Sequence, residues 1–221
     1  MFPQNIKFSL KLPFLAAVLL AAAQSQSVLA VPSLTLSSAG ENYTTVDSDG
    51  DGAIDFSGTV GNFELYFTVG LTKPLIGTAE NPWLDVISLN ATTGIEGGTL
   101  TLRFEEDNFV GTPLWLQASI GGLTDGSIIY NTYVNGVLFS TSGTLLGPTF
   151  SDVQSGLLTA PAPYKLTIEA ILTHTDGGQI SSFDAELKAV SGVVSVPDGG
   201  STALLLGLGL LGFARSRRLK S

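Results

Sequence analysis

Apolar and polar residues alternate with period two through the middle of this sequence, and the pattern limits what the chain can form. Apolar residues at every second position share one face of an extended strand, so each such run predicts a strand buried on one side. No stretch between residues 31 and 195 keeps a helical period. The sequence therefore predicts an all-β domain. The expected core positions are Phe63, Leu65, Phe67 and Val69; Leu100, Leu102 and Phe104; Leu166, Ile168, Ala170 and Leu172; and Phe183, Ala185 and Leu187.

Turn residues interrupt these runs at regular intervals. Asn135-Gly136 lies between the segments 128–134 and 137–141, and both residues tolerate the positive φ of a tight hairpin turn. The spacing predicts about eight to ten strands in two packed antiparallel sheets, a β-sandwich of which a jelly roll is one form. A closed barrel is the alternative. The other breaks are Asp125-Gly126, Gly147-Pro148, Pro161-Ala162-Pro163 and Asp176-Gly177-Gly178.

The middle of the chain is strongly acidic. Residues 31–197 contain four basic and eighteen acidic side chains, a net charge of −14, because most of the basic residues lie in the two ends. Such a domain repels phosphate backbones, so nucleic acid is not an expected partner, whereas cations or neutral glycans are compatible with it. The chain has no cysteine, which excludes disulfides, thiol catalysis and thiolate metal sites.

The first thirty residues, 1–30, have the layout of a secretory signal peptide. Lys7 and Lys11 form a weakly basic start, residues 12–23 are apolar, and Val28-Leu29-Ala30 provides a small-residue cleavage site. We expect signal peptidase to cut after Ala30. An uncleaved anchor is the alternative, but about twelve apolar residues fall short of the ~20 that span a bilayer as a helix.

The last residues, 196–221, have a second three-part layout of break, apolar run and basic end. As a helix, the apolar core of the run rises only ~18 Å against ~30 Å of hydrocarbon, so it would hold the chain in the membrane only transiently. By the positive-inside rule the basic end stays cytoplasmic and the domain 31–195 faces outward. The break consists of Val196, Pro197, Asp198, Gly199 and Gly200, and the basic end contains Arg215, Arg217 and Arg218.

This C-terminal segment resembles the sorting signal of PEP-CTERM proteins, which are substrates of exosortase in Gram-negative bacteria. The resemblance rests on the order of Pro-Asp-Gly-Gly, the apolar run and Arg-Ser-Arg-Arg. The motif reads Val-Pro-Asp-Gly-Gly in place of the eponymous Pro-Glu-Pro, so it looks like a VPDGG-type variant. A weaker similarity to the bodies of some family members covers residues 61–74 and 181–190.

The resemblance implies an export route and offers no established activity to carry over. It implies cleavage near Pro197-Asp198 by an exosortase-type transpeptidase, after a transient stay in the inner membrane. The destination would be the cell surface, the outer membrane or an exopolysaccharide matrix, with a simple tail anchor as the alternative. Because the export signals are the only specific features and nothing else in the sequence demands a ligand, we expect a structural or matrix-associated surface protein rather than an enzyme. A carbohydrate-binding module and a hydrolase are the alternatives.

Acidic residues at alternate positions between 47 and 55 match the opening of a calcium-binding loop. In the D-x-D-x-D-G pattern, alternate carboxylates point to one centre and glycine permits the sharp turn. The twelfth position is Gly58, so the bidentate glutamate of an EF-hand is missing and a full EF-hand is excluded. A weak calcium site and a solvated Asp/Gly turn both remain, and no other cofactor is expected. The expected ligands are Asp47, Asp49, Asp51, the carbonyl of Ala53, and Asp55.

Three other groups of residues could support chemistry, and each has a simpler interpretation. His174, the only histidine, lies beside Asp176 and fits a polar residue flanking a turn better than a catalytic base. Glu105-Glu106-Asp107 could supply a glycosidase pair but fits a charged loop after a strand. Four aromatic residues could form a sugar-binding platform or lie in the core; they are Trp83, Trp115, Tyr130 and Tyr133.

Overall fold

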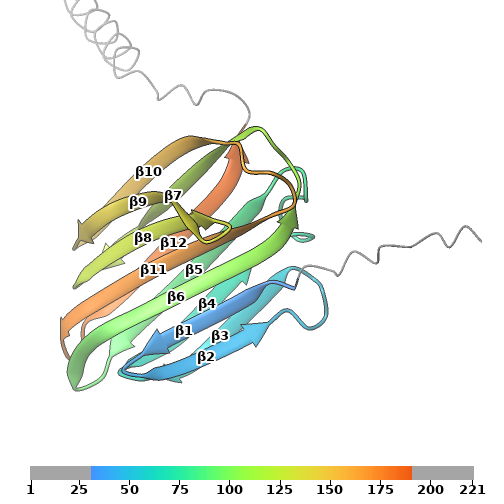
Figure 1. Ribbon diagram of the computed structural model, residues 1–221. Helices are drawn as coiled ribbons and strands as arrows, with labels where there is room; N and C mark the ends of the chain where they lie inside the picture. The colour runs from blue at the N-terminus through green and yellow to red at the C-terminus, as the bar shows by residue number, and fades with distance from the viewer. Residues whose placement is uncertain (1–30, 191–221) are drawn as a thin grey trace, which may run out of the picture.

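The computed structural model of the protein describes residues 31–190, which form twelve β-strands and no helix (Figure 1). The signal peptide expected at 1–30 and the sorting tail expected at 196–221 lie outside the described residues, as does the segment 191–195. Within residues 31–190 no helix has the length and apolarity to cross a bilayer. The strands are β1 (Ser33–Ser38), β2 (Glu41–Val46), β3 (Ala53–Val60), β4 (Phe63–Leu71), β5 (Trp83–Thr93), β6 (Glu96–Phe109), β7 (Leu114–Thr124), β8 (Ser127–Val134), β9 (Val137–Leu146), β10 (Thr149–Leu158), β11 (Tyr164–Asp176) and β12 (Ile180–Val190).

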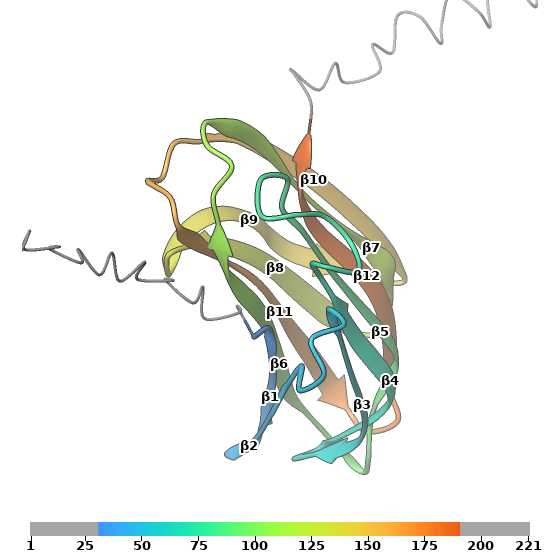
Figure 2. The same cartoon turned by 90° about the vertical axis from the view of Figure 1, so that its right-hand side faces the viewer.

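Two six-stranded sheets face each other as a β-sandwich, which confirms the expected fold (Figure 2). Sheet A has the order β2-β1-β6-β11-β8-β9, and sheet B has the order β10-β7-β12-β5-β4-β3. All neighbouring strands run antiparallel. The edge strands β2 and β3 therefore lie at one side of the sandwich, and β9 and β10 lie at the other (Figure 1).

The core between the sheets is built from the inward members of the alternating runs. The apolar sets expected on β6, β11 and β12 are all buried, and none of their side chains is more than 4% exposed. Leu34 and Leu36 of β1 face the same core from sheet A, and Leu84 and Val86 of β5 face it from sheet B. Period two in the sequence thus corresponds to one buried face on each of these strands.

Strand β4 departs from the expected alternation. Its first two apolar residues are buried as predicted, but the pairing with β3 then shifts by one residue and the next inward side chain is Thr68. Phe67 is consequently 39% exposed, and Val69 also lies on the outer face. The prediction that these two residues face the core is wrong, because a β-bulge inserts one extra residue and reverses the side-chain phase. The buried Thr68 hydroxyl pairs with Ser88 Oγ at 3.1 Å.

The structure has twelve strands where about eight to ten were expected. The strands that the pattern missed include β2 and β10, which lie at sheet edges. Most residues of β2 are exposed on both faces, and β10 is polar and largely exposed. A strand without one fully buried face carries no alternating signal, so its sequence looks like that of a loop.

The tight turn expected at Asn135-Gly136 is confirmed between β8 and β9. The two residues have positive φ angles of 51° and 78°. Asn135 Oδ1 accepts a hydrogen bond from the Lys165 N–H at 2.8 Å, and the Asn135 N–H donates to the Lys165 carbonyl at 2.9 Å. The turn is therefore attached to the start of β11 as well as to its own hairpin.

Candidate functional sites

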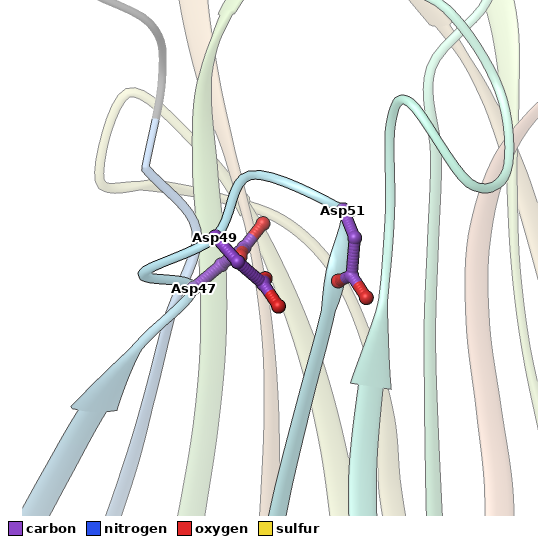
Figure 3. Close-up of side chains that lie close together, drawn as sticks. All are labelled: Asp47, Asp49 and Asp51. Carbon is purple, nitrogen blue, oxygen red and sulfur yellow. The ribbon is translucent and has the colours of Figure 1, made fainter.

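The aspartate loop (residues 47–52) joins β2 to β3 and is held together by its own carboxylates (Figure 3). Asp47 is 6% exposed, and it accepts hydrogen bonds from the N–H groups of Gly50 (2.7 Å) and Gly52 (2.8 Å). Asp51 Oδ1 accepts one from the Ala53 N–H at 2.8 Å. Burial alone would raise the pKa of Asp47, but the backbone hydrogen bonds and one with Asp49 lower it. Asp47 is therefore ionised at neutral pH.

Gly52 lets the aspartate loop pack closely against the segment that follows β4. Its φ is +85°, and a Cβ at this position would lie 2.6 Å from the Thr72 carbonyl oxygen. The Thr72 N–H also donates a hydrogen bond to the Gly52 carbonyl at 2.8 Å. The turn and the close approach both require glycine here, as the loop pattern predicted.

The aspartate loop brings three carboxylates together. One oxygen from each of Asp47, Asp49 and Asp51 lies within 4.8 Å of the others, and Figure 3 shows the three side chains along the loop. Asp49 and Asp51 are exposed. Ala53 is the first residue of β3, and Asp55 lies further along that strand, opposite Val69. Of the four expected carboxylate ligands, the structure thus groups three, and Asp55 is not among them.

His174 is a core residue, so the prediction of a turn-flanking position is wrong. Its side chain on β11 is 1% exposed, and its ring centroid lies 5.2 Å from that of Phe63. Nε2 lies 2.8 Å from Ser181 Oγ, and Nδ1 lies 3.3 Å from Thr93 Oγ1. Ser181 Oγ is in turn 2.6 Å from Thr124 Oγ1. This hydroxyl network joins β11 of sheet A to β5, β7 and β12 of sheet B.

The contact between His174 and Ser181 is enclosed by the core. Ser181 is 0% exposed, so its hydroxyl cannot meet a substrate in this conformation. Burial lowers the pKa of His174, against the charge of Asp125, and keeps the imidazole neutral. The Asp176 backbone carbonyl accepts a hydrogen bond from Thr93 Oγ1 at 2.9 Å. These groups therefore hold the two sheets together at one end of the sandwich.

The run Glu105-Glu106-Asp107 lies within β6, so the prediction of a charged loop is wrong. Glu105 faces outward and accepts a hydrogen bond from Arg103 Nε at 2.5 Å. Glu106 faces inward, is 2% exposed and forms an ion pair with Lys73. Burial raises the pKa of Glu106, and the hydrogen bond from Lys73 opposes this rise. Neighbouring residues of a strand point to opposite faces, so Glu105 and Glu106 do not form a catalytic pair.

The four aromatic residues do not form one platform. Tyr130 is buried, and its Oη donates a hydrogen bond to the Glu186 carbonyl at 2.6 Å. Tyr133 alternates with buried neighbours on β8 and lies on the outer face of sheet A. Trp83 and Trp115 alternate with buried leucines on β5 and β7, and they lie on the outer face of sheet B. The two tryptophans are therefore on the opposite side of the molecule from Tyr133.

An acidic cluster that the sequence did not reveal lies on the outer face of sheet B. Asp85 of β5 is directly opposite Glu186 of β12, with Asp184 two residues along the same strand. Burial, followed by the adjacent Asp184 carboxyl and the charge of Glu186, raises the pKa of Asp85 to about 7, while Lys188 opposes the shift. Lys188 Nζ lies 2.5 Å from Glu186 Oε2. Only the register of β5 with β12 brings these residues together, and nothing local in the sequence marks it.

The sandwich has weak likeness to solved structures. The CBM36-1 domain of a multidomain xylanase from the hindgut metagenome of Trinervitermes trinervoides is 12% identical with a TM-score of 0.28, covering 64% of this chain and 99% of its own. A family 35 carbohydrate-binding module from Clostridium thermocellum is 17% identical with a TM-score of 0.28, covering 65% and 95%. Similarity this low says nothing about a shared ligand. No curated protein matches the chain in sequence.

The C-terminus has a specific match. Residues 195–220 match the VPDSG-CTERM motif. In this chain the motif reads Val196-Pro197-Asp198-Gly199-Gly200, so glycine stands at the position of the serine in the motif's name. Such a signal marks an exported, surface-targeted protein. The chain therefore carries a PEP-CTERM-like C-terminal sorting signal of the VPDSG-CTERM variant, which confirms the resemblance found in the sequence.

Proposed function

We propose that this chain is a cell-surface or extracellular-matrix protein of a Gram-negative bacterium, and that an exosortase-type transpeptidase processes it from a transient inner-membrane intermediate. The sorting signal at residues 195–220 is the observation that carries the proposal. The last strand, β12, ends at Val190, so only a few residues separate the sandwich from the motif. Signal peptidase would remove residues 1–30, and an exopolysaccharide matrix is the proposed destination.

We propose a structural or binding role for the sandwich, without catalysis. Of the three arrangements with catalytic potential considered among residues 31–190, two are occupied by structural contacts. His174 and Ser181 are buried, and the adjacent Glu105 and Glu106 diverge into separate ion pairs. The third arrangement, the acidic cluster at Asp85, has its charge partly neutralised by Lys188.

The intact mass of the extracellular form tests the sorting route, because it reports both processing sites at once. We expect termini near Val31 and near Asp198. A Pro197→Ala, Asp198→Ala variant should instead accumulate in the inner-membrane fraction with its basic tail attached. Pro161→Ala changes an exposed proline of the domain and should be processed like the wild type. An extracellular wild-type form that retains the basic tail would rule out the exosortase step.

We also propose that the aspartate loop is a weak calcium site. Three carboxylate oxygens lie within 4.8 Å of one another, and two of the side chains are exposed to incoming ions. Each Asp47 oxygen already accepts one N–H, which fixes the carboxylate and leaves its other lone pairs available. Three carboxylates without a bidentate glutamate fit the affinity of extracellular modules, about 10⁻⁴–10⁻³ M.

Thermal unfolding with and without calcium tests this site. Calcium should raise the melting temperature of the wild type and of Asp55→Asn, because Asp55 lies outside the grouped carboxylates. It should not raise that of an Asp49→Asn, Asp51→Asn variant. The same calcium response in the double variant and the wild type would exclude a calcium site at the aspartate loop.

Glycan binding on the outer face of sheet B is a second candidate function. Trp83 and Trp115 lie on β5 and β7, the strands that flank β12 on this face, and Lys188 Nζ lies 5.2 Å from the centroid of the Trp83 ring. Half-buried aromatic rings can stack on sugar rings. In affinity electrophoresis with the host exopolysaccharide, Trp115→Ala should lose retardation and Tyr133→Ala should keep it. Equal mobility of Trp115→Ala and the wild type would exclude this face.

A further inference from the structure

Strand β10 is an edge strand with an unusually regular backbone. All ten of its residues pair with β7 in one uninterrupted register, from Thr149 opposite Leu123 to Leu158 opposite Leu114. It is the last strand of sheet B, so no strand within the described residues is hydrogen-bonded to its other side, and β9 of sheet A packs beside it without pairing (Figure 1). A long, flat edge presents a row of unpaired N–H and C=O groups that can pair with another strand.

The other three edge strands carry features that oppose such pairing. The register of β9 with β8 shifts twice, and that of β3 with β4 shifts once. Strand β2 has only six residues and carries Glu41, and β3 carries Asp55. Bulges, short length and charge are the usual protections of a sheet edge. Strand β10 has no bulge and no proline, and its single charged side chain is Asp152.

The edge of sheet B at β10 combines exposed apolar side chains with few charges. Val153 and Leu157 of β10 are 59% and 52% exposed, and Leu123 of β7, which lies opposite Thr149, is 49% exposed. Strand β9 beside it has no charged residue. The rest of the domain contributes almost all of a net charge of −14. Electrostatic repulsion between two acidic copies is therefore weaker at this edge than at the surfaces where acidic residues cluster.

We propose that β10 pairs with β10 of a second copy of this chain, antiparallel about a two-fold axis at Val153, so that the two B sheets become one. In this register Val153 faces Val153 of the second copy, and Asp152 faces Gln154. The side chains of Asp152 and Gln154 already form a hydrogen bond within one chain, in which Gln154 Nε2 donates to Asp152 Oδ2 at 3.1 Å. A register centred on Asp152 would set two carboxylates against each other, which like-charge repulsion disfavours.

Single cysteines test this register, because the wild-type chain has none. Val153→Cys in the purified extracellular form should give a disulfide-linked dimer on mild oxidation, since opposite residues of an antiparallel pair lie about 4.5–5.5 Å apart. Ser155→Cys alone should not, because its own copy would lie about 13 Å along the strand. A mixture of Ser151→Cys and Ser155→Cys proteins should cross-link. Equal cross-linking of Val153→Cys and Ser155→Cys would overturn the proposal.

Sedimentation equilibrium provides an independent test. The wild type should dimerise, and Val153→Lys should weaken the dimer about tenfold or more, because two like charges would face each other at the axis. Val46→Lys is the matched control, since Val46 is 50% exposed on the edge strand β2. Val153 is itself largely exposed, so the substitution should leave folding intact. A wild-type protein that stays monomeric at all concentrations would refute pairing with a second copy. The proposal would also be refuted if β10 pairs with a strand of another protein while the wild type stays monomeric.

Discussion

The replacement of Asp85 by asparagine should make the domain more stable in mildly alkaline solution and leave it unchanged in acid. Asp85 faces Glu186 across β5 and β12, and its pKa is raised from 3.8 to about 7, chiefly by burial and then by Asp184. The folded state therefore binds the Asp85 proton more tightly than the unfolded state does. The associated stability is complete below about pH 4 and is lost as the pH rises through about 7.

The size of this effect follows from the two pKa values. A rise from 3.8 to about 7 corresponds to a ceiling of about 4 kcal/mol at ~1.4 kcal/mol per pK unit. Asp85 is only partly buried, so screening by solvent reduces the expected loss to about 2 kcal/mol. Asparagine has the same shape and no charge. Asp85→Asn should therefore match the wild type near pH 4 and exceed its free energy of unfolding by about 2 kcal/mol near pH 8.

Urea unfolding of both proteins across this pH range measures the difference directly. Asp55→Asn is the control, because it removes one charge from an exposed position on the same sheet. It reports how much of any change comes from the net charge of the domain alone. A difference between Asp85→Asn and the wild type that stays constant from pH 4 to pH 8 would refute the reasoning, as would a variant that is less stable at pH 8.

Three further substitutions probe the buried polar groups. Burial lowers the pKa of His174, so its contribution to stability is complete above the unfolded pKa of 6.5 and is lost as the pH falls below that value. His174→Gln should therefore reduce the fall in the free energy of unfolding between neutral and acidic pH. Thr68→Val should cost about 1–2 kcal/mol by leaving the Ser88 hydroxyl unpaired, and a double Thr68→Val, Ser88→Ala variant should recover most of the loss in urea unfolding. Lys73→Met should destabilise the fold by about 3 kcal/mol near pH 7, because it leaves the Glu106 carboxylate buried without its cation, and acidification should reduce the deficit.

The sequence predicts the inward faces of β6, β11 and β12 because one side of each strand is buried over the alternating residues 100–104, 166–172 and 183–187. The same reasoning fails on β4, where the sequence continues to alternate while the backbone inserts a bulge before Thr68. No residue type marks that bulge. The edge strands β2 and β10 are missed for a different reason, since neither strand has one face that is buried along its whole length and so neither requires a regular apolar period.

The aspartate loop could be predicted because its hydrogen bonds and its carboxylates are local in sequence. The other sites depend on how the two sheets pack and on the register of their strands. His174 contacts Thr93 and Ser181 on two strands of the opposite sheet, and Ser181 also pairs with Thr124 on a third. Asp85 meets Glu186 only across β5 and β12. Neither arrangement leaves a spacing that a single sequence can display.

The sorting signal would favour pairing through the β10 edge by raising the local concentration of the protein. The transient membrane stage that we propose would confine the copies of the domain to a thin layer and raise their effective concentration to a level that dilute solution does not reach. The net charge of −14 keeps such crowded copies apart least strongly along the edge at β10 and β9, where Asp152 is the single charged side chain. Pairing too weak to persist in dilute solution would then be populated at the membrane. We therefore expect the Val153→Cys cross-link to form more completely on the proposed membrane-held intermediate than on the released protein.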